Sequence, residues 1–202
     1  MTAIIDYGVG NLFSLKSSMA AIGAEAVVTR DPAEIERADH IILPGVGAFG
    51  DAAEKLKQAG MFTFVQELAA KGKPMLGICL GMQLLFDHST EYGVHEGLGL
   101  VPGEVREIEG VIPKNLDIPH MGWNALHFVK ESPLFEGLQE GAHVYFVHSY
   151  AAFDCEAHLL ATAEYGVPLT AAVQNGNVFG TQFHPEKSGE TGLRILKNFV
   201  NV

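Results

Sequence analysis

The segment GICLGMQLLF, residues 77–86, follows one short apolar run and leads into another. Its first five residues place Cys79 between Gly77 and Gly81, with one residue on either side of the cysteine. This spacing is typical of a nucleophile elbow, a sharp turn from strand to helix in which glycines remove Cβ atoms that would clash. The segment therefore predicts an α/β fold with Cys79 at the carboxyl end of a strand, where open α/β sheets bind ligands.

A cysteine at this turn is open to two interpretations. At a helix N-terminus, the positive end of the helix dipole favours the reactive thiolate, and the N–H of Leu80 points to where an oxyanion would form. The other interpretation is a buried structural cysteine, because free cysteines are among the most buried residues. The segment alone favours neither.

Strands alternate with helices throughout the first half of the chain. We expect strands at residues 2–6, 24–29, 40–44 and 73–79, and helices at residues 11–22, 51–59 and 61–71. Asp31 and Pro32 suit the cap and first turn of a further short helix. This alternation predicts an α/β fold with an open, mostly parallel central sheet flanked by helices.

The second half of the chain has a different pattern. From residue 103 to residue 181, short alternating segments with Gly, Pro and Asn between them predict a smaller antiparallel or mixed extension. Asn175-Gly176 indicates a hairpin turn, and residues 190–200 form a last helix with an apolar face. No repeat or linker interrupts the pattern, so residues 1–202 are expected to form a single domain.

The composition excludes some partners. The chain has 202 residues, 48% of them hydrophobic, and a formal net charge of −11 with only 13 Lys and Arg residues. Nucleic acids and anionic membranes are bound by clustered positive charge, so neither is an expected partner. We see no signal peptide, and the apolar runs are shorter than the roughly 20 residues that span a bilayer. With only two cysteines, Cys79 and Cys155, these features favour a cytoplasmic protein without disulfides.

A second candidate site is the segment TQFHPE, residues 181–186. If this segment is extended, His184 and Glu186 lie on one face and Pro185 points away. A carboxylate beside an imidazole fixes its tautomer and stabilises the imidazolium, and a Cys–His pair activates a thiol. A surface histidine next to an unrelated glutamate is the alternative. None of the nine histidines lies in a zinc-binding pattern, so no metal site is expected.

The third candidate is the loop Gly45–Gly50, GVGAFG, which matches the G-x-G-x-x-G pattern of dinucleotide-binding proteins. The loop follows the third expected strand rather than the first, and the next strand ends without the acidic residue that would bind a ribose. The alternative is a glycine turn whose backbone N–H groups supply a second oxyanion donor beside the cysteine. A dinucleotide-binding protein is accordingly the second functional hypothesis.

Two of these segments together are highly specific. GICLGMQLLF and TQFHPEKS closely resemble the cysteine and His/Glu segments of the class-I glutamine amidotransferases. Within that family, IIDYGVGN, LPGVGAFGDAA, PHMGWN and YFVHSY resemble the glutaminase subunits of imidazole glycerol phosphate synthases, which act in histidine biosynthesis. The resemblance extends from the first expected strand to the last helix, and it implies the fold of that family.

The resemblance also implies the chemistry and the residues that perform it. It makes Cys79 the nucleophile, His184 the general base and acid, and Glu186 the carboxylate that orients the histidine. Glutamine would be hydrolysed to glutamate and ammonia through a cysteinyl thioester, without a cofactor. The remaining implied positions are the oxyanion donors Leu80 and Val46 or Gly47, and the glutamine-binding residues Gln83, Ser149 and Tyr150.

The ammonia implies a partner, because free ammonia at neutral pH is mostly protonated and loses its nucleophilicity. In the family the partner is a separate cyclase subunit with a (βα)₈-barrel fold, which forms a heterodimer with the glutaminase. Trp123, the only tryptophan, lies among polar neighbours and suits an interface, although a core position is the alternative. The expected interface residues are Asn11, Met121, Trp123 and Asn124.

Overall fold

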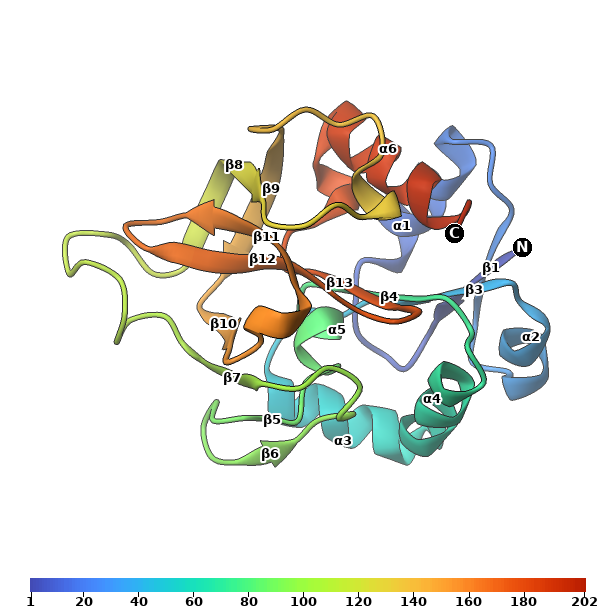
Figure 1. Cartoon of the computed structure of the whole chain (residues 1–202). Helices are drawn as coiled ribbons and strands as arrows, with labels where there is room; N and C mark the ends of the chain where they lie inside the picture. Colours follow the sequence, from blue (N-terminus) through green and yellow to red (C-terminus); the bar gives the residue numbers. More distant parts are fainter.

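Nine strands form one continuous sheet in the computed structural model, which describes residues 1–202 (Figure 1). Their spatial order is β2-β1-β3-β4-β13-β12-β11-β8-β9. The strands are, in that order, Ala26–Thr29, Thr2–Ile5, His40–Leu43, Met75–Ile78, Val178–Thr181, Pro168–Asn175, Leu159–Glu164, His120–Phe128 and His143–His148.

The sheet changes direction at its centre. From β2 to β13 all neighbouring strands run parallel, and from β13 to β9 all run antiparallel. The expected α/β sheet flanked by helices is confirmed, but the antiparallel part is as extensive as the parallel part. Its hairpin is closed by the pair Asn175–Val178, so Gly176 and Asn177 form the two-residue turn.

Helices cover both faces of the parallel half (Figure 1). In β1, Ile4 points to a core shared with α1 and α6, whereas Ala3 and Ile5 point to a core shared with α3 and α4. This alternation follows from the two-residue period of a strand. The helices are α1 Leu12–Ala21, α2 Pro32–Arg37, α3 Phe49–Gln58, α4 Met61–Ala70, α5 Leu80–Gln83 and α6 Gly189–Phe199.

The first helices begin where local chemistry predicts. Asn11 caps α1 by accepting a hydrogen bond from the N–H of Ser14, and Asp31 caps α2 by accepting one from Ala33. Pro32 occupies the first position of α2, where its missing N–H leaves no acceptor unpaired. No helix combines the length and apolar character that crossing a bilayer requires.

A second, four-stranded sheet lies beside the main one in the order β10-β7-β5-β6 (Figure 1). It is built from Tyr150–Phe153, Glu104–Glu107, His88–Ser89 and His95–Glu96. Three single-turn 3₁₀ helices, η1 Pro133–Phe135, η2 Glu156–His158 and η3 Pro185–Lys187, complete the structure. The second sheet places residues 88–92 next to the carboxyl end of the parallel strands, where they take part in the site described below.

Candidate active site

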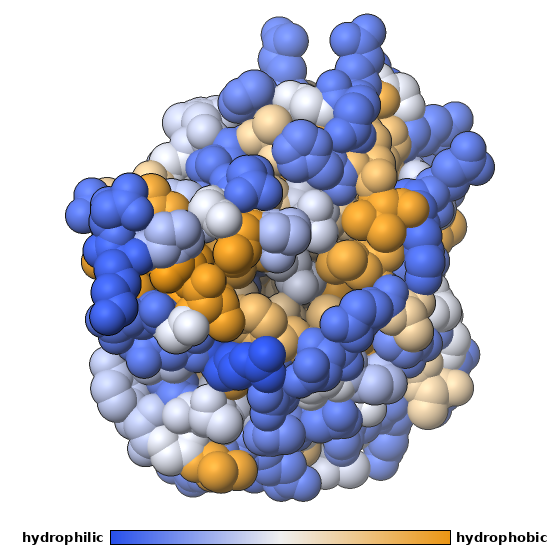
Figure 2. Space-filling view, turned by 60° about the vertical axis from the view of Figure 1, so that its left-hand side comes forward, coloured by the Kyte–Doolittle hydropathy of each residue, from blue (hydrophilic) through white to orange (hydrophobic).

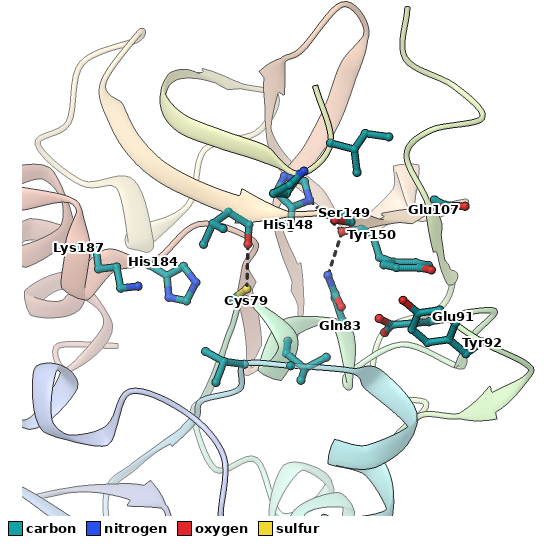
Figure 3. Close-up of a pocket in the computed structure, with 16 residues that line it drawn as sticks. Cys79, Gln83, Glu91, Tyr92, Glu107, His148, Ser149, Tyr150, His184 and Lys187 are labelled. Atoms are coloured by element: carbon teal, nitrogen blue, oxygen red, sulfur yellow. Dashed lines mark hydrogen bonds between the residues drawn. The ribbon is translucent and has the colours of Figure 1, made fainter. Parts of the chain in front are cut away.

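The pairing of β4 with β13 brings the two candidate segments together. Thr181 of β13 lies opposite Ile78 of β4, and the N–H of Cys79 donates to the carbonyl oxygen of Thr181 at 2.7 Å. Both strands are parallel, so Cys79 and His184 follow at the same edge of the sheet. Figure 3 shows the Cys79 sulfur and the His184 ring next to each other in one pocket.

The turn at Cys79 is the strained elbow that its sequence predicts. Cys79 has φ 53° and ψ −112°, a conformation that residues with a Cβ rarely adopt and that is often found at functional sites. A Cβ at Gly81 would lie 1.9 Å from the carbonyl oxygen of Leu43, and one at Gly77 would lie 2.6 Å from that of Gly81. The flanking glycines are therefore required by close backbone approach.

The helix after the elbow is too short to have a large helix dipole. α5 comprises only four residues, Leu80–Gln83, so its partial charge at the N-terminus is small. The first N–H groups of any helix nonetheless lack an intrahelical acceptor, which leaves that of Leu80 available to an anion. The main positive charge near the sulfur has to come from a side chain.

His184 supplies that charge. Its Nδ1 lies 2.8 Å from Oε1 of Glu186, and the two side chains are only 2% and 1% exposed. The second oxygen of Glu186 is buried without a partner, so the imidazole is the main group that compensates the carboxylate. The expectation of an extended segment is wrong here, because Pro185–Lys187 form the single turn η3; that turn brings the two side chains together instead.

The protonation of His184 follows from these contacts. Burial by itself lowers the pKa of His184, but hydrogen bonds with Cys79 and Glu186 outweigh it and raise the pKa to about 9. The ring is therefore an imidazolium at neutral pH. With Nδ1 bound to the carboxylate, Nε2 is the atom that faces the thiol.

Gln182 and the carbonyl oxygen of Val147, which lies 3.9 Å from the sulfur, complete the surroundings of Cys79, and Gln83 supports Gln182. Gln182 is fully buried, and its Nε2 lies 3.7 Å from the Cys79 sulfur, to which it donates. Gln83 donates both of its amide hydrogens, to Oε1 of Gln182 and to the carbonyl oxygen of Tyr150, each at 3.0 Å. Only the carbonyl oxygen of Gln83 is then free for a ligand. Gln182, which lies in the bend just after β13, was not recognised from the sequence, because a single glutamine carries no distinctive signal.

A cavity of about 460 Å³ opens in front of Cys79. Figure 2, which brings the left-hand side of Figure 1 forward, shows a hollowed face with apolar side chains gathered on both sides of the hollow. Glu186 lies behind His184 and does not line the cavity. The expected site residues that line it are Val46, Gly47, Cys79, Leu80, Gln83, Ser149, Tyr150 and His184.

Glu91 also lines the cavity and was missed in the sequence. Its carboxylate accepts a hydrogen bond from the N–H of Phe49 at 2.7 Å, and burial raises its pKa. Figure 3 places Glu91 at the end of the cavity opposite His184. The stretch around it has no distinctive pattern, and only the second sheet brings it to the site.

A chain of histidines connects the cavity wall with β8. His148 lines the cavity, and burial lowers its pKa to about 3, so the ring is neutral. Its Nδ1 donates to the carbonyl oxygen of Tyr150 at 2.8 Å, and its Nε2 lies 2.9 Å from Nδ1 of His120. Nε2 of His120 in turn lies 2.9 Å from Oδ1 of Asn124, whose Nδ2 donates to the backbone carbonyl oxygen of Glu164. Both polar atoms of the Asn124 amide thus have a partner within the chain.

The other expected interface residues differ in exposure. Met121 and Trp123 project from β8 with 63% and 54% of their surface exposed, so Trp123 is not a core residue of this chain. The Trp123 ring meets that of Tyr145 edge-on at 6.1 Å. Asn11 is half-buried and caps α1, as described above.

Comparison with known proteins agrees with this geometry. The family model of glutamine amidotransferase class-I matches residues 3–202. The chain belongs to the class-I glutamine amidotransferases.

Curated relatives of this amidotransferase share one name. The proteins called imidazole glycerol phosphate synthase subunit HisH in Sulfurimonas denitrificans and Oceanobacillus iheyensis are each 51% identical to it. The first alignment covers 99% of this chain and 97% of the relative, and the second covers 98% of each. As the name of these relatives says, they are subunits of a larger enzyme.

Solved structures show the same fold. A crystal structure of a glutamine amidotransferase aligns with a TM-score of 0.76 and 20% identity over 98% of this chain and 97% of its own. The structure of PurLQS from Thermotoga maritima aligns with a TM-score of 0.76 and 21% identity over 99% and 97%. At these identities the likeness concerns the fold alone.

In this amidotransferase the glycine loop Gly45–Gly50 packs closely against other parts of the protein. A Cβ at Gly45 would lie 2.7 Å from the N–H nitrogen of Gly81, and one at Gly50 would lie 2.6 Å from the ring of His95. The first and third glycines of the G-x-G-x-x-G pattern therefore face protein atoms, and Val46 and Gly47 between them line the cysteine cavity. The dinucleotide hypothesis is not supported by this arrangement.

The raised pKa of His184 predicts a stability that falls at alkaline pH. The folded state holds the His184 proton up to pH about 9, whereas the unfolded chain releases it near pH 6.5. The binding of this proton contributes fully to the free energy of unfolding below pH 6.5. The contribution is lost as the pH rises to 9, by up to about 3 kcal/mol, because each pKa unit corresponds to about 1.4 kcal/mol. Urea unfolding at pH 6 and pH 9 should show this loss in the wild type and a smaller loss in His184→Gln. Equal losses in the two proteins would contradict the assigned protonation.

Proposed function

We propose that this chain is the glutaminase subunit of an imidazole glycerol phosphate synthase, which acts in histidine biosynthesis. The observation that carries the proposal is the buried row of sulfur, imidazole and carboxylate at the edge of a substrate-sized cavity. Full-length relatives of the same name at 51% identity support the same assignment. The substrate is then L-glutamine, and the products of this subunit are glutamate and ammonia.

In the first half of the reaction the Cys79 thiolate attacks the side-chain amide carbon of glutamine. The carbonyl oxygen becomes an oxyanion, for which the N–H of Leu80 and a backbone N–H of Val46 or Gly47 are the proposed donors. The imidazolium of His184 gives its Nε2 proton to the amide nitrogen, the carbon–nitrogen bond breaks, and ammonia leaves. A glutamyl thioester on Cys79 and a neutral His184 remain.

In the second half, neutral His184 takes a proton from water while the water oxygen attacks the thioester carbon. The carbon–sulfur bond breaks, glutamate leaves, and the thiolate–imidazolium pair is restored. Glu186 holds Nδ1 and stabilises the imidazolium in both halves without itself accepting the proton. This reaction needs no cofactor or metal, because acyl transfer uses only these groups.

Glutamine would lie with its amino-acid end away from Cys79. Its α-ammonium group needs acceptors, and the free oxygen of Gln83 and the carboxylate of Glu91 are such acceptors at that end of the cavity. Ser149 and Tyr150 line the cavity beside them and are proposed to hold the α-carboxylate through polar groups. This orientation directs the side-chain amide toward the sulfur.

The proposed partner is a cyclase subunit with a (βα)₈-barrel fold, in a heterodimer with this chain. Ammonia has to reach the partner before it is protonated in bulk water, so the partner must cover the mouth of the cavity. Trp123 contacts the ring of Tyr145. Lys187 lines the cavity, and its Nζ lies over the same Tyr145 ring, 5.8 Å from the ring centroid. An exposed aromatic residue thus adjoins the cavity, as expected for an interface anchor.

We further infer that residues 1–202 act as one domain in the cytoplasm. One sheet runs through the whole chain, its parallel half carries a helical layer on each face, and no linker divides it. Both cysteines are free thiols, in keeping with a reducing compartment.

The glutaminase assignment predicts that glutamate release depends on one thiol. With the cyclase subunit present, Cys79→Ala should lower the release of glutamate from glutamine at least about 1,000-fold, because no other group can form the thioester. Cys155→Ala is the matched control, since Cys155 is buried away from the cavity against Thr170, and it should retain activity. Full activity of the Cys79→Ala protein would refute the assignment.

The interface proposal predicts that Trp123→Ala weakens association with the cyclase subunit. Removal of a central aromatic anchor should raise the Kd at least about tenfold, measured by titration of one subunit with the other. Val129→Ala, which removes an exposed side chain just past the end of β8, is the control and should bind as the wild type does. Unchanged thermal unfolding would show that both variants fold, and an unchanged Kd for Trp123→Ala would exclude the anchor.

A further inference from the structure

Tyr92 has three properties that the proposed reaction does not explain. It lines the cavity in front of Cys79, 87% of its surface is exposed, and its φ of 53° lies in the left-handed region. Tyr92 follows Glu91 directly. An outlier of this kind at a cavity is a reason to look for a function.

The side chain of Tyr92 contributes little that would offset the strain of this conformation. A left-handed backbone is unfavourable for a residue with a Cβ, and the exposed ring gains little from packing. The hydroxyl group of Tyr92 makes no hydrogen bond within the chain. Glycine would adopt the same φ without strain, so the tyrosine side chain is the feature that requires an explanation.

The preceding residue holds the tyrosine in place. The N–H of Glu91 donates to Oγ of Ser89 at 3.1 Å, and the Glu91 carboxylate accepts from Phe49 at 2.7 Å. Ser89 belongs to β5, which pairs with β7, so the second sheet supports the turn. The backbone of the turn that carries Tyr92 is therefore held by ordered neighbours, which places the side chain at the cavity.

The ring lies at the end of the cavity that is proposed to hold the α-ammonium group. Figure 3 shows Tyr92 beside Glu91 and Tyr150, with Glu107 near them and with His184 and Lys187 at the opposite end. Desolvation and the charges of Glu107 and Glu91 raise the pKa of Tyr150, which agrees with this close grouping. An aromatic face next to a carboxylate is a favourable environment for an ammonium ion.

We propose that Tyr92 is a specificity-determining residue that covers the α-ammonium group of bound glutamine with its ring. The proposal rests on the glutaminase function proposed above. Glu91 and the oxygen of Gln83 bind the ammonium group from within the cavity, and the Tyr92 ring closes the solvent side. A cation–π contact and exclusion of water then favour a substrate with a free α-amino group.

This position predicts an effect on binding rather than on chemistry. The ring is remote from the sulfur and contacts a group whose charge does not change during amide hydrolysis. Such an interaction stabilises the bound substrate and the transition state equally, so its loss raises KM and leaves kcat unchanged. A purely structural role would not produce this separation.

The test compares Tyr92→Ala with Tyr92→Phe in complex with the cyclase subunit. The substrates are glutamine and 4-carbamoylbutanoate, which is glutamine without its α-amino group. Tyr92→Ala should raise the KM for glutamine about three- to tenfold with little change in kcat, whereas Tyr92→Phe, which keeps the ring, should resemble the wild type. The KM for 4-carbamoylbutanoate should be the same in all three proteins.

A second variant separates strain from binding. Tyr92→Gly removes the ring and relieves the left-handed strain, so it should raise the KM for glutamine while raising the Tm. Calorimetric titration of glutamine into Cys79→Ala, with and without Tyr92→Ala, measures the same contribution in the absence of turnover. It therefore distinguishes failure of this inference from failure of the proposed glutaminase reaction.

Three results would overturn the inference. An unchanged glutamine KM and Kd in Tyr92→Ala would show that the ring does not contact substrate. An equal rise in KM for both substrates would show that it shapes the cavity without recognising the ammonium group. A fall in kcat together with weaker binding of the cyclase subunit would make Tyr92 a partner contact instead.

Discussion

The pairing of β4 with β13 is the constraint on which the rest of the site depends. Cys79 follows one strand, and the segment with Gln182 and His184 follows the other. The hydrogen bond from the Cys79 N–H to the carbonyl oxygen of Thr181, 2.7 Å long, fixes their register. A shift of one residue in this register would turn every side chain of β13 to the opposite face. The position of the imidazole beside the sulfur is thus a property of the sheet, and the loops only refine it.

Burial makes this arrangement electrostatically demanding. Glu186 has one oxygen bound to His184 and the other buried without a partner, so a neutral ring would leave a poorly compensated carboxylate. Burial would lower the pKa of an isolated histidine, but here the hydrogen bonds and charge interactions of His184 with the Cys79 sulfur and the Glu186 carboxylate outweigh that effect. The short helix α5 adds little, which assigns activation of the sulfur mainly to the imidazolium.

Much of this could be predicted from the sequence, because the signals were local. Glycines around Cys79, the caps of α1 and α2 and the turn at Gly176 each specify a conformation through a few adjacent residues. The His/Glu pair was predicted for the wrong reason, since a proline-led 3₁₀ turn replaces the expected extended segment. The extent of the antiparallel half and the roles of Gln182, Glu91 and Tyr92 could not be predicted, because they depend on strand pairings that no local pattern encodes.

The most direct test of the central claim is to trap the acyl intermediate. The complex with the cyclase subunit would be mixed with glutamine, quenched in acid during turnover and examined by mass spectrometry after digestion. The account predicts one glutamyl group, labile to hydroxylamine, on the peptide that contains Cys79. Continued glutamate release with no adduct on that peptide, or with the adduct on another residue, would contradict it.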